Sequence, residues 1–140
     1  MSIKKWYKSN MCFFLAGLLV AGCSSKNTNP EVRWETFNVN VLNKIDLVSV
    51  VTWAKDQLNS TNENGFIFSP AVYPQQLSKL HPIVVQIQMD TQTGFKFIFV
   101  GFKLGIEREG IMIGSTEAKI NNYGYRRQLT NGVYYVYDTN

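Results

Sequence analysis

The segment from Phe95 to Leu104 (FKFIFVGFKL) constrains the fold of this chain more than any other. Apolar side chains stand at both odd and even positions, and only two lysines and a glycine interrupt them. Successive side chains of a strand point to opposite faces, so this pattern predicts a central strand that is covered on both faces. One helix covers one face only. We expect the N-terminal strand and the loop of residues 66–74, or a partner protein, to cover Ile98, Val100, Phe102 and Leu104.

Two further strands are predicted beside this one. Ile83 to Met89 alternates apolar residues with glutamines, as is typical of a strand with one solvated face. Ile111 to Ile113 predicts the neighbour on the other side. We interpret the charged stretch Glu107–Gly110 before it as a solvent-exposed turn.

A hairpin is predicted near the C-terminus. Tyr123–Arg127 and Val133–Tyr137 are rich in aromatic and β-branched residues, and they flank Asn131-Gly132. The Asn-Gly pair favours a tight turn between antiparallel strands.

The residues before these strands predict one strand and one helix. Phe37 to Val41 alternates apolar and polar residues, which suits a half-buried strand. Ile45 to Leu58 is predicted as a helix, with Asn43 as its cap and Asp46 in its first turn. Its many β-branched residues leave a strand as the alternative. The expected apolar face of the helix consists of Leu47, Val48, Val51, Ala54 and Leu58.

Together these elements predict an α+β fold. One N-terminal helix would pack on an antiparallel meander sheet of about four to six strands. The chain contains no second segment with good helical periodicity, so parallel βαβ units are not expected.

The first 22 residues have the features of an export signal. Lys4, Lys5 and Lys8 precede an uncharged run, Met11–Gly22. As a helix this run would extend roughly 18 Å, short of the roughly 30 Å that a membrane span must cross. A basic start followed by a short apolar run is typical of a signal peptide.

The run ends in Val20-Ala21-Gly22-Cys23, which resembles the lipobox of bacterial lipoprotein precursors. The resemblance implies that residues 1–22 are removed and that Cys23 carries a diacylglyceryl group and an N-acyl chain such as palmitate. Because Ser24 is not aspartate, it also implies sorting to the outer membrane, facing the periplasm. The alternative is an uncleaved anchor or a buried helix. Residues 23–30 would be a flexible tether and residues 31–140 a single α+β domain.

Loss of the signal would change the charge of the protein. It removes three of the 14 basic residues and none of the 10 acidic ones, so the net charge falls from +4 to +1. The basic balance therefore belongs to the export signal. An exported protein with a lipid anchor is not expected to bind nucleic acid.

Residues that could carry catalysis are few. The one histidine, His81, precedes Pro82, and we interpret it as a turn or packing residue. Glu107 and Glu109 flank an arginine at the expected turn. We predict no enzymatic activity, no metal site and no cofactor beyond the lipid on Cys23.

The C-terminal hairpin combines tyrosines and arginines, the residue types enriched at the energetic centres of protein interfaces. The alternative is a tyrosine-rich sheet whose inward rings fill the core. The predicted partner-binding residues are Tyr123, Tyr125, Arg126, Arg127, Tyr135 and Tyr137.

In size, export signal and composition, the chain is similar to small periplasmic immunity proteins against bacteriocins. This resemblance implies a lipoprotein that binds and neutralises a protein partner, either a bacteriocin or an envelope-lytic toxin. The alternative is a structural lipoprotein subunit of a secretion, conjugation or envelope-assembly complex. The partner is in either case a protein, and the membrane is reached through the lipid anchor.

Overall fold

The structure is a computed structural model that describes residues 29–139. The predicted signal peptide, Cys23 and most of the predicted tether lie outside this range. The chain divides into two units, residues 1–33 and 34–140, and the boundary falls inside helix α2 (Pro30–Asn40). All five strands and the helices α3 (Leu47–Ser60) and α4 (Gln75–Ser78) belong to the second unit.

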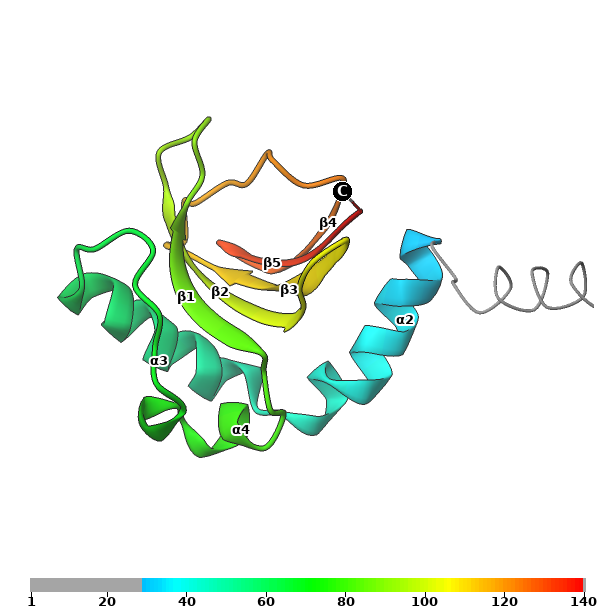
Figure 1. The fold of residues 1–140 in the computed structure, drawn as a ribbon, viewed down its shortest axis with the longest axis horizontal. Helices are drawn as coiled ribbons and strands as arrows, with labels where there is room; N and C mark the ends of the chain where they lie inside the picture. Colours follow the sequence, from blue (N-terminus) through cyan, green and yellow to red (C-terminus); the bar gives the residue numbers. More distant parts are fainter. Residues whose placement is uncertain (1–28, 140) are drawn as a thin grey trace, which may run out of the picture. The chain divides into compact units, whose positions relative to one another are not determined.

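The strands form one antiparallel sheet, which confirms the predicted α+β class (Figure 1). In sequence order they are β1 (Val84–Met89), β2 (Lys96–Lys103), β3 (Glu107–Ile113), β4 (Tyr125–Thr130) and β5 (Val133–Thr139). Their order in the sheet is β1-β2-β3-β5-β4. The sheet thus departs from a strict meander at its last hairpin, where β5 pairs with β3 and β4 becomes the edge strand.

The strand predicted at Phe37–Val41 is wrong, because most of this segment belongs to α2. Phe37 and Val41 are four residues apart, and at that spacing both reach the same side of a helix. Both pack into the core, whereas Val39 between them is exposed. Phe37 and Val41 therefore belong to one helical face, and Val39 lies outside it.

The helix predicted at Ile45–Leu58 is confirmed as α3, but its cap is Asp46 rather than Asn43. Asp46 Oδ1 accepts hydrogen bonds from the Val48 and Ser49 amides at 3.1 and 3.4 Å, and Oδ2 accepts one from Ser49 Oγ at 2.6 Å. The predicted face is wrong at Val48, which is 74% exposed. Val50 and Ala54, four residues apart, are the fully buried pair.

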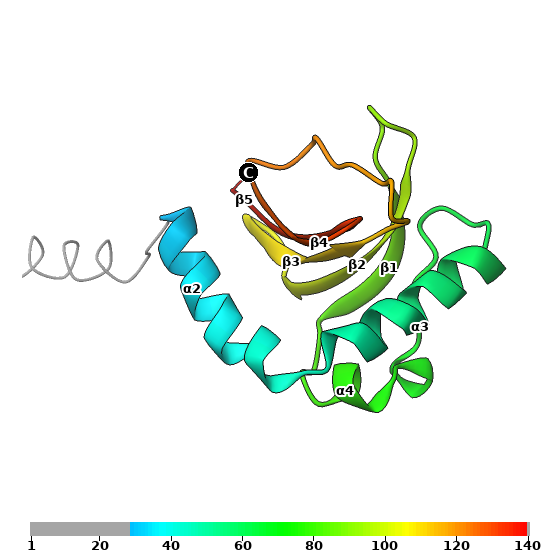
Figure 2. The same ribbon diagram turned by 180° about the vertical axis from the view of Figure 1, so that it is seen from behind.

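A helix-side cluster fills one face of the sheet. The strands pack there against Phe37 of α2, Val50 of α3, Leu77 of α4 and Phe68 of the loop before α4. Figures 1 and 2 show α3 and α4 on this side of the sheet from opposite directions. Its buried members from the strands are Val85, Ile87, Ile98, Val100, Ile111, Ile113, Val133, Tyr135 and Tyr137.

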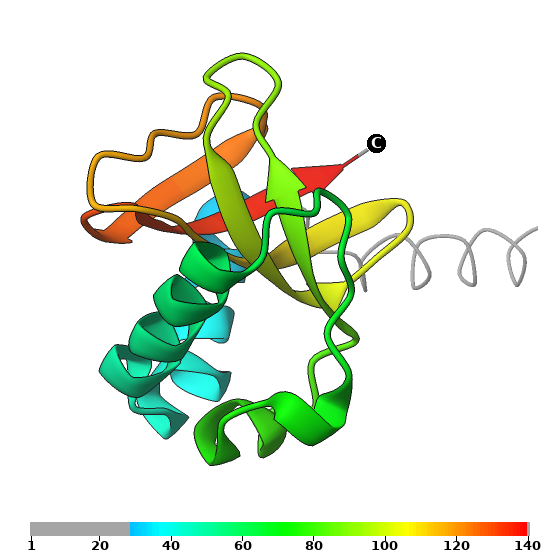
Figure 3. The same ribbon diagram turned by 90° about the vertical axis from the view of Figure 1, so that its left-hand side faces the viewer.

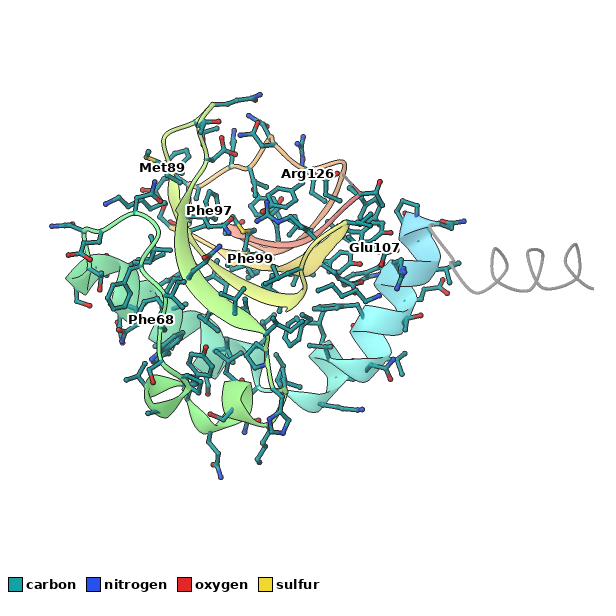
Figure 4. All side chains as sticks on the ribbon, in the orientation of Figure 1. Phe68, Met89, Phe97, Phe99, Glu107 and Arg126 are labelled. Atoms are coloured by element: carbon teal, nitrogen blue, oxygen red, sulfur yellow. The ribbon has the colours of Figure 1, made fainter. Side chains whose placement is uncertain are left out.

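A connection-side cluster fills the opposite face. It is covered by the β3–β4 connection (residues 114–124), which contributes Ala118 and Ile120. Phe97 and Phe99 of β2 point toward this connection, as Figure 4 shows. The cluster also contains Met112, Tyr134 and Val136.

The predicted double coverage of β2 is therefore confirmed, and the loop of residues 66–74 does help to cover Ile98 and Val100, but helix α3 covers this same face rather than the opposite one. Ile98 and Val100 face the helices, and Phe68 of the loop of residues 66–74 packs on that same side. Leu104 is 46% exposed. The second cover comes from the β3–β4 connection of the same chain. None of the helices between residues 29 and 139 is long and apolar enough to cross a membrane.

Candidate functional site

The six predicted partner-binding residues do not form one surface. Tyr135 is fully buried and Tyr137 is 3% exposed, so these two belong to the core and cannot offer a docking surface. They lie on β5, which has a neighbouring strand on each side and helices over the face to which they point. For these two tyrosines the alternative, rings that fill the core, is the correct one.

The remaining hairpin residues divide between the two faces of β4. Tyr125 and Arg127 pair with Tyr137 and Tyr135 and share the helix side of the sheet. Arg126 pairs with Val136 and is exposed on the connection side, as Figure 4 shows. The edge strand therefore presents an arginine on each face.

On the helix side, Trp34 completes a surface that we call the Trp34–Arg127 patch, made of Trp34, Tyr125 and Arg127. The Arg127 guanidinium lies 4.6 Å from the centre of the Trp34 ring, within the range of a cation–π contact. The rings of Trp34 and Tyr125 both lie against Tyr135, at 5.2 and 6.1 Å between centroids. Arg127 is exposed, and Trp34 and Tyr125 are half-buried.

Sequence reasoning missed Trp34, although a signal for it was present. Trp34 precedes Phe37 by three residues, which places both on one helical face. The prediction of a strand at Phe37–Val41 left this helical spacing unrecognised.

On the connection side, an aromatic stack holds a second arginine. The Phe99 ring lies over Gly101 and Gly110, where a Cβ would come within 2.7 and 2.6 Å of its atoms. Arg108 lies 5.3 Å from the centre of this ring and 5.6 Å from that of Tyr123. Glycines in β2 and β3 thus give Phe99 and Arg108 the room to stack.

Arg108 and Tyr123 line a small cavity of about 140 Å³, which we call the Arg108 pocket. Arg108 Nη2 donates to Gln88 Oε1 at 3.3 Å, and the Tyr123 hydroxyl lies 3.4 Å from the same oxygen. Burial raises the pKa of Tyr123, so its hydroxyl remains protonated and can donate. The other lining residues are Met89, Asp90, Met112, Ile120 and Asn122.

Asp90, which lines this pocket, is buried, and both of its carboxylate oxygens accept hydrogen bonds. Its carboxylate accepts hydrogen bonds from the Gln92, Thr93 and Asn121 amides at 2.9 to 3.0 Å, and from Asn122 Nδ2 at 3.3 Å. Burial raises the pKa of Asp90, but the hydrogen bonds from the three amides outweigh it and lower the pKa below its usual value. Asp90 is therefore ionised at neutral pH.

The predicted turn at Glu107–Gly110 is wrong, because these residues lie in β3. Glu109 is only 6% exposed and accepts a hydrogen bond from the Tyr135 hydroxyl at 2.7 Å. Lys103 Nζ lies 3.5 Å from Glu107 and 3.9 Å from Glu109. The bond from Tyr135 and the pairing with β5 thus hold these charged residues in a strand, where local composition alone favours a loop.

Neither His81 nor the second hollow of the described residues is part of the Arg108 pocket. His81 is exposed, with a positive φ of 49°. A larger hollow of about 380 Å³ is lined by Lys55, Lys96, Ser115 and other residues that do not line the pocket. Within residues 29–139, no group of three or more His, Cys, Asp or Glu side chains is placed to hold a metal ion.

Comparisons with protein-family models, curated proteins and solved structures found no match for this chain. Its function must therefore be inferred from its own surfaces. Both candidate sites combine an arginine with aromatic rings. Such sites recognise carboxylates and the side chains of protein partners, because guanidinium donates in a planar fork while the rings supply apolar area.

Proposed function

We propose that this chain is a non-enzymatic lipoprotein that binds and neutralises a protein partner. It would be anchored by the lipid on Cys23 in the outer membrane and face the periplasm. The partner would be a bacteriocin or an envelope-lytic toxin, and the protein would act as an immunity or inhibitor protein.

The Trp34–Arg127 patch is the observation that carries the protein-binding part of this proposal. Tryptophan, tyrosine and arginine are the types that most often lose 2 kcal/mol or more of binding energy on truncation to alanine. Here the Arg127 side chain lies on an indole ring that is itself packed on Tyr135, which limits the side-chain entropy lost on binding.

The alternative, a structural subunit, depends on the expectation that a neighbouring protein covers one face of β2. The β3–β4 connection supplies that cover within the chain, through Ala118 and Ile120. No other observation on the described residues favours a structural subunit over a binding protein.

The proposal is tested by deletion of the gene and challenge with each toxin encoded beside it. We expect the deletion to sensitise cells and the wild-type gene to restore protection. Arg127→Ala and Trp34→Ala should each reduce protection. Lys79→Ala, which removes an exposed cation outside the patch, should not. Unchanged sensitivity of the deletion strain to every such toxin would overturn the proposal.

A Cys23→Ser variant separates binding from anchoring. Purified from the soluble fraction, it should still bind the toxin in a pull-down, while protection in cells falls. Equal protection by the unlipidated protein would contradict the requirement for the anchor.

A further inference from the structure

The Arg108 pocket holds a cation whose hydrogen-bonding capacity is largely unused. A guanidinium carries five N–H donors, and Arg108 uses one of them toward Gln88 Oε1. The rings of Phe99 and Tyr123 contact the guanidinium without accepting these protons in its plane. Among residues 29–139, Arg108 takes part in no ion pair.

The Asp90 carboxylate and the Gln88 side-chain oxygen, which line the pocket, are in contrast occupied. The Asp90 carboxylate accepts from three backbone amides and from Asn122. Gln88 Oε1 accepts from both Arg108 and Tyr123, which leaves the Nε2 protons of Gln88 for another partner. Asp138 stands opposite Arg108 in the sheet register but makes no ion pair with it. The unused polar groups of the pocket are therefore the donors of Arg108 and Gln88, and the complementary ligand is an acceptor.

The size of the pocket limits that ligand to a small group. Its volume of about 140 Å³ corresponds to roughly five water molecules at about 30 Å³ each. Sites for whole small molecules usually enclose about 300 Å³ or more. Met112 and Ile120 add an apolar lining suited to methylene groups. A carboxylate on a short aliphatic stem, as in a glutamate side chain, meets both requirements.

We propose that the Arg108 pocket binds a carboxylate, with Arg108 and Gln88 as the donors. This inference rests on the proposed function, since the carboxylate would be an acidic side chain of the protein partner. The pocket would then receive an acidic anchor on the connection side of the sheet, and the Trp34–Arg127 patch would bind on the other side.

Arginine side-chain NMR on the full chain in detergent micelles tests the pocket directly. The sequence contains four arginines, Arg33, Arg108, Arg126 and Arg127, so the Nε–Hε spectrum is simple. We expect N-acetyl-glutamate N-methylamide to shift the Arg108 signal saturably, with an apparent Kd of about 1–10 mM for so few contacting atoms. The matched neutral compound, N-acetyl-glutamine N-methylamide, should bind at least tenfold more weakly.

Two variants distinguish carboxylate binding in the Arg108 pocket from nonspecific attraction to positive charge. Arg108→Lys keeps the charge but loses the planar fork, and should weaken binding about tenfold. Arg126→Lys, at an exposed position on the same side of the sheet, should leave the Arg108 titration unchanged. If Arg108→Lys fails to fold, the wild-type titration and the Arg126 control still decide the question.

Three results would overturn the inference: equal shifts with the neutral compound, equal shifts at all four arginines, or tighter binding of inorganic phosphate than of the glutamate compound. Failure here combined with normal protection against a toxin would leave the proposed function intact. Binding of the glutamate compound without any protection phenotype would instead support the pocket and contradict the proposed function.

Discussion

The backbone amide of Asn121 donates a 3.0 Å hydrogen bond to Oδ2 of Asp90, which joins two segments that are far apart in the chain. Asp90 begins the turn between β1 and β2, and Asn121 lies in the β3–β4 connection. The β1–β2 turn and this connection lie side by side in Figure 3. Thr93 Oγ1 adds a second bond between these segments, to the Lys119 carbonyl at 3.2 Å. The cover over Phe97 and Phe99 is thus fixed in place by one buried carboxylate and its turn.

Replacing Asp90 by asparagine should destabilise the protein by about 1.5–3 kcal/mol, because the charged acceptor of several buried hydrogen bonds is lost. Urea denaturation measures the difference. Asp46→Asn is the matched control, since asparagine caps a helix about as well as aspartate and the site is exposed. Equal losses for the two variants would show that Asp90 does not hold the connection.

The same carboxylate predicts a pH dependence of stability. The folded-state pKa of Asp90 is lowered from its usual value of 3.8, so its contribution is fully present above that pH. The contribution is lost as the pH falls through the lower, folded-state pKa. The free energies of unfolding of the wild type and Asp90→Asn should therefore converge below about pH 4. A constant difference from pH 7 to pH 2 would contradict this assignment.

How far the sequence predicts the fold depends on whether the decisive contacts are local. The alternation of β1, the continuous apolar run of β2 and the Asn131-Gly132 turn predict the observed elements correctly, because each depends on a pattern within a few residues. The cover over Phe99 was not, because residues 114–124 place Ala118 and Ile120 among polar residues without a regular period.

The candidate sites show the same limit. The sequence predicts that the tyrosines and arginines of the C-terminal hairpin share one surface, but Arg126 and Arg127 point to opposite sides of an edge strand. Arg108 was assigned to a turn because charged residues surround it. Its place in β3 depends on partners such as Tyr135, which bonds to Glu109 from 26 residues away.

Tyr135→Phe should cost about 1.5–3 kcal/mol, because it removes the hydroxyl that donates to the buried Glu109 carboxylate. Tyr134→Phe is the control within the same strand. Its hydroxyl donates to a neutral acceptor, the Ala118 carbonyl at 3.1 Å, and its loss should cost about 0.5–1.5 kcal/mol. Chemical denaturation of both variants gives the comparison, and a larger loss for Tyr134→Phe would refute the importance of Glu109.

Alanine at the two glycines under Phe99 should have unequal effects. At Gly101 the new Cβ meets only side chains, those of Phe99 and Val84, whereas at Gly110 it also meets the Val100 carbonyl oxygen. Overpacking costs about 1–3 kcal/mol, and we expect Gly110→Ala at the upper end because backbone cannot move aside. Phe99→Leu should partly rescue Gly101→Ala but not Gly110→Ala, as thermal denaturation of the double variants would show. Equal rescue of both would mean that the ring, rather than the backbone, sets the cost.

A double-mutant cycle tests whether Arg127 and Trp34 act as one unit. Their cation–π contact at 4.6 Å should give a coupling of about 0.5–1 kcal/mol between Arg127→Gln and Trp34→Leu, measured by urea denaturation. Arg126→Gln combined with Trp34→Leu should be additive, because Arg126 lies on the other face of β4. In the protection assay Arg127→Gln should then add little to Trp34→Leu. Independent effects of the two on both stability and protection would mean that the pair does not form one binding element.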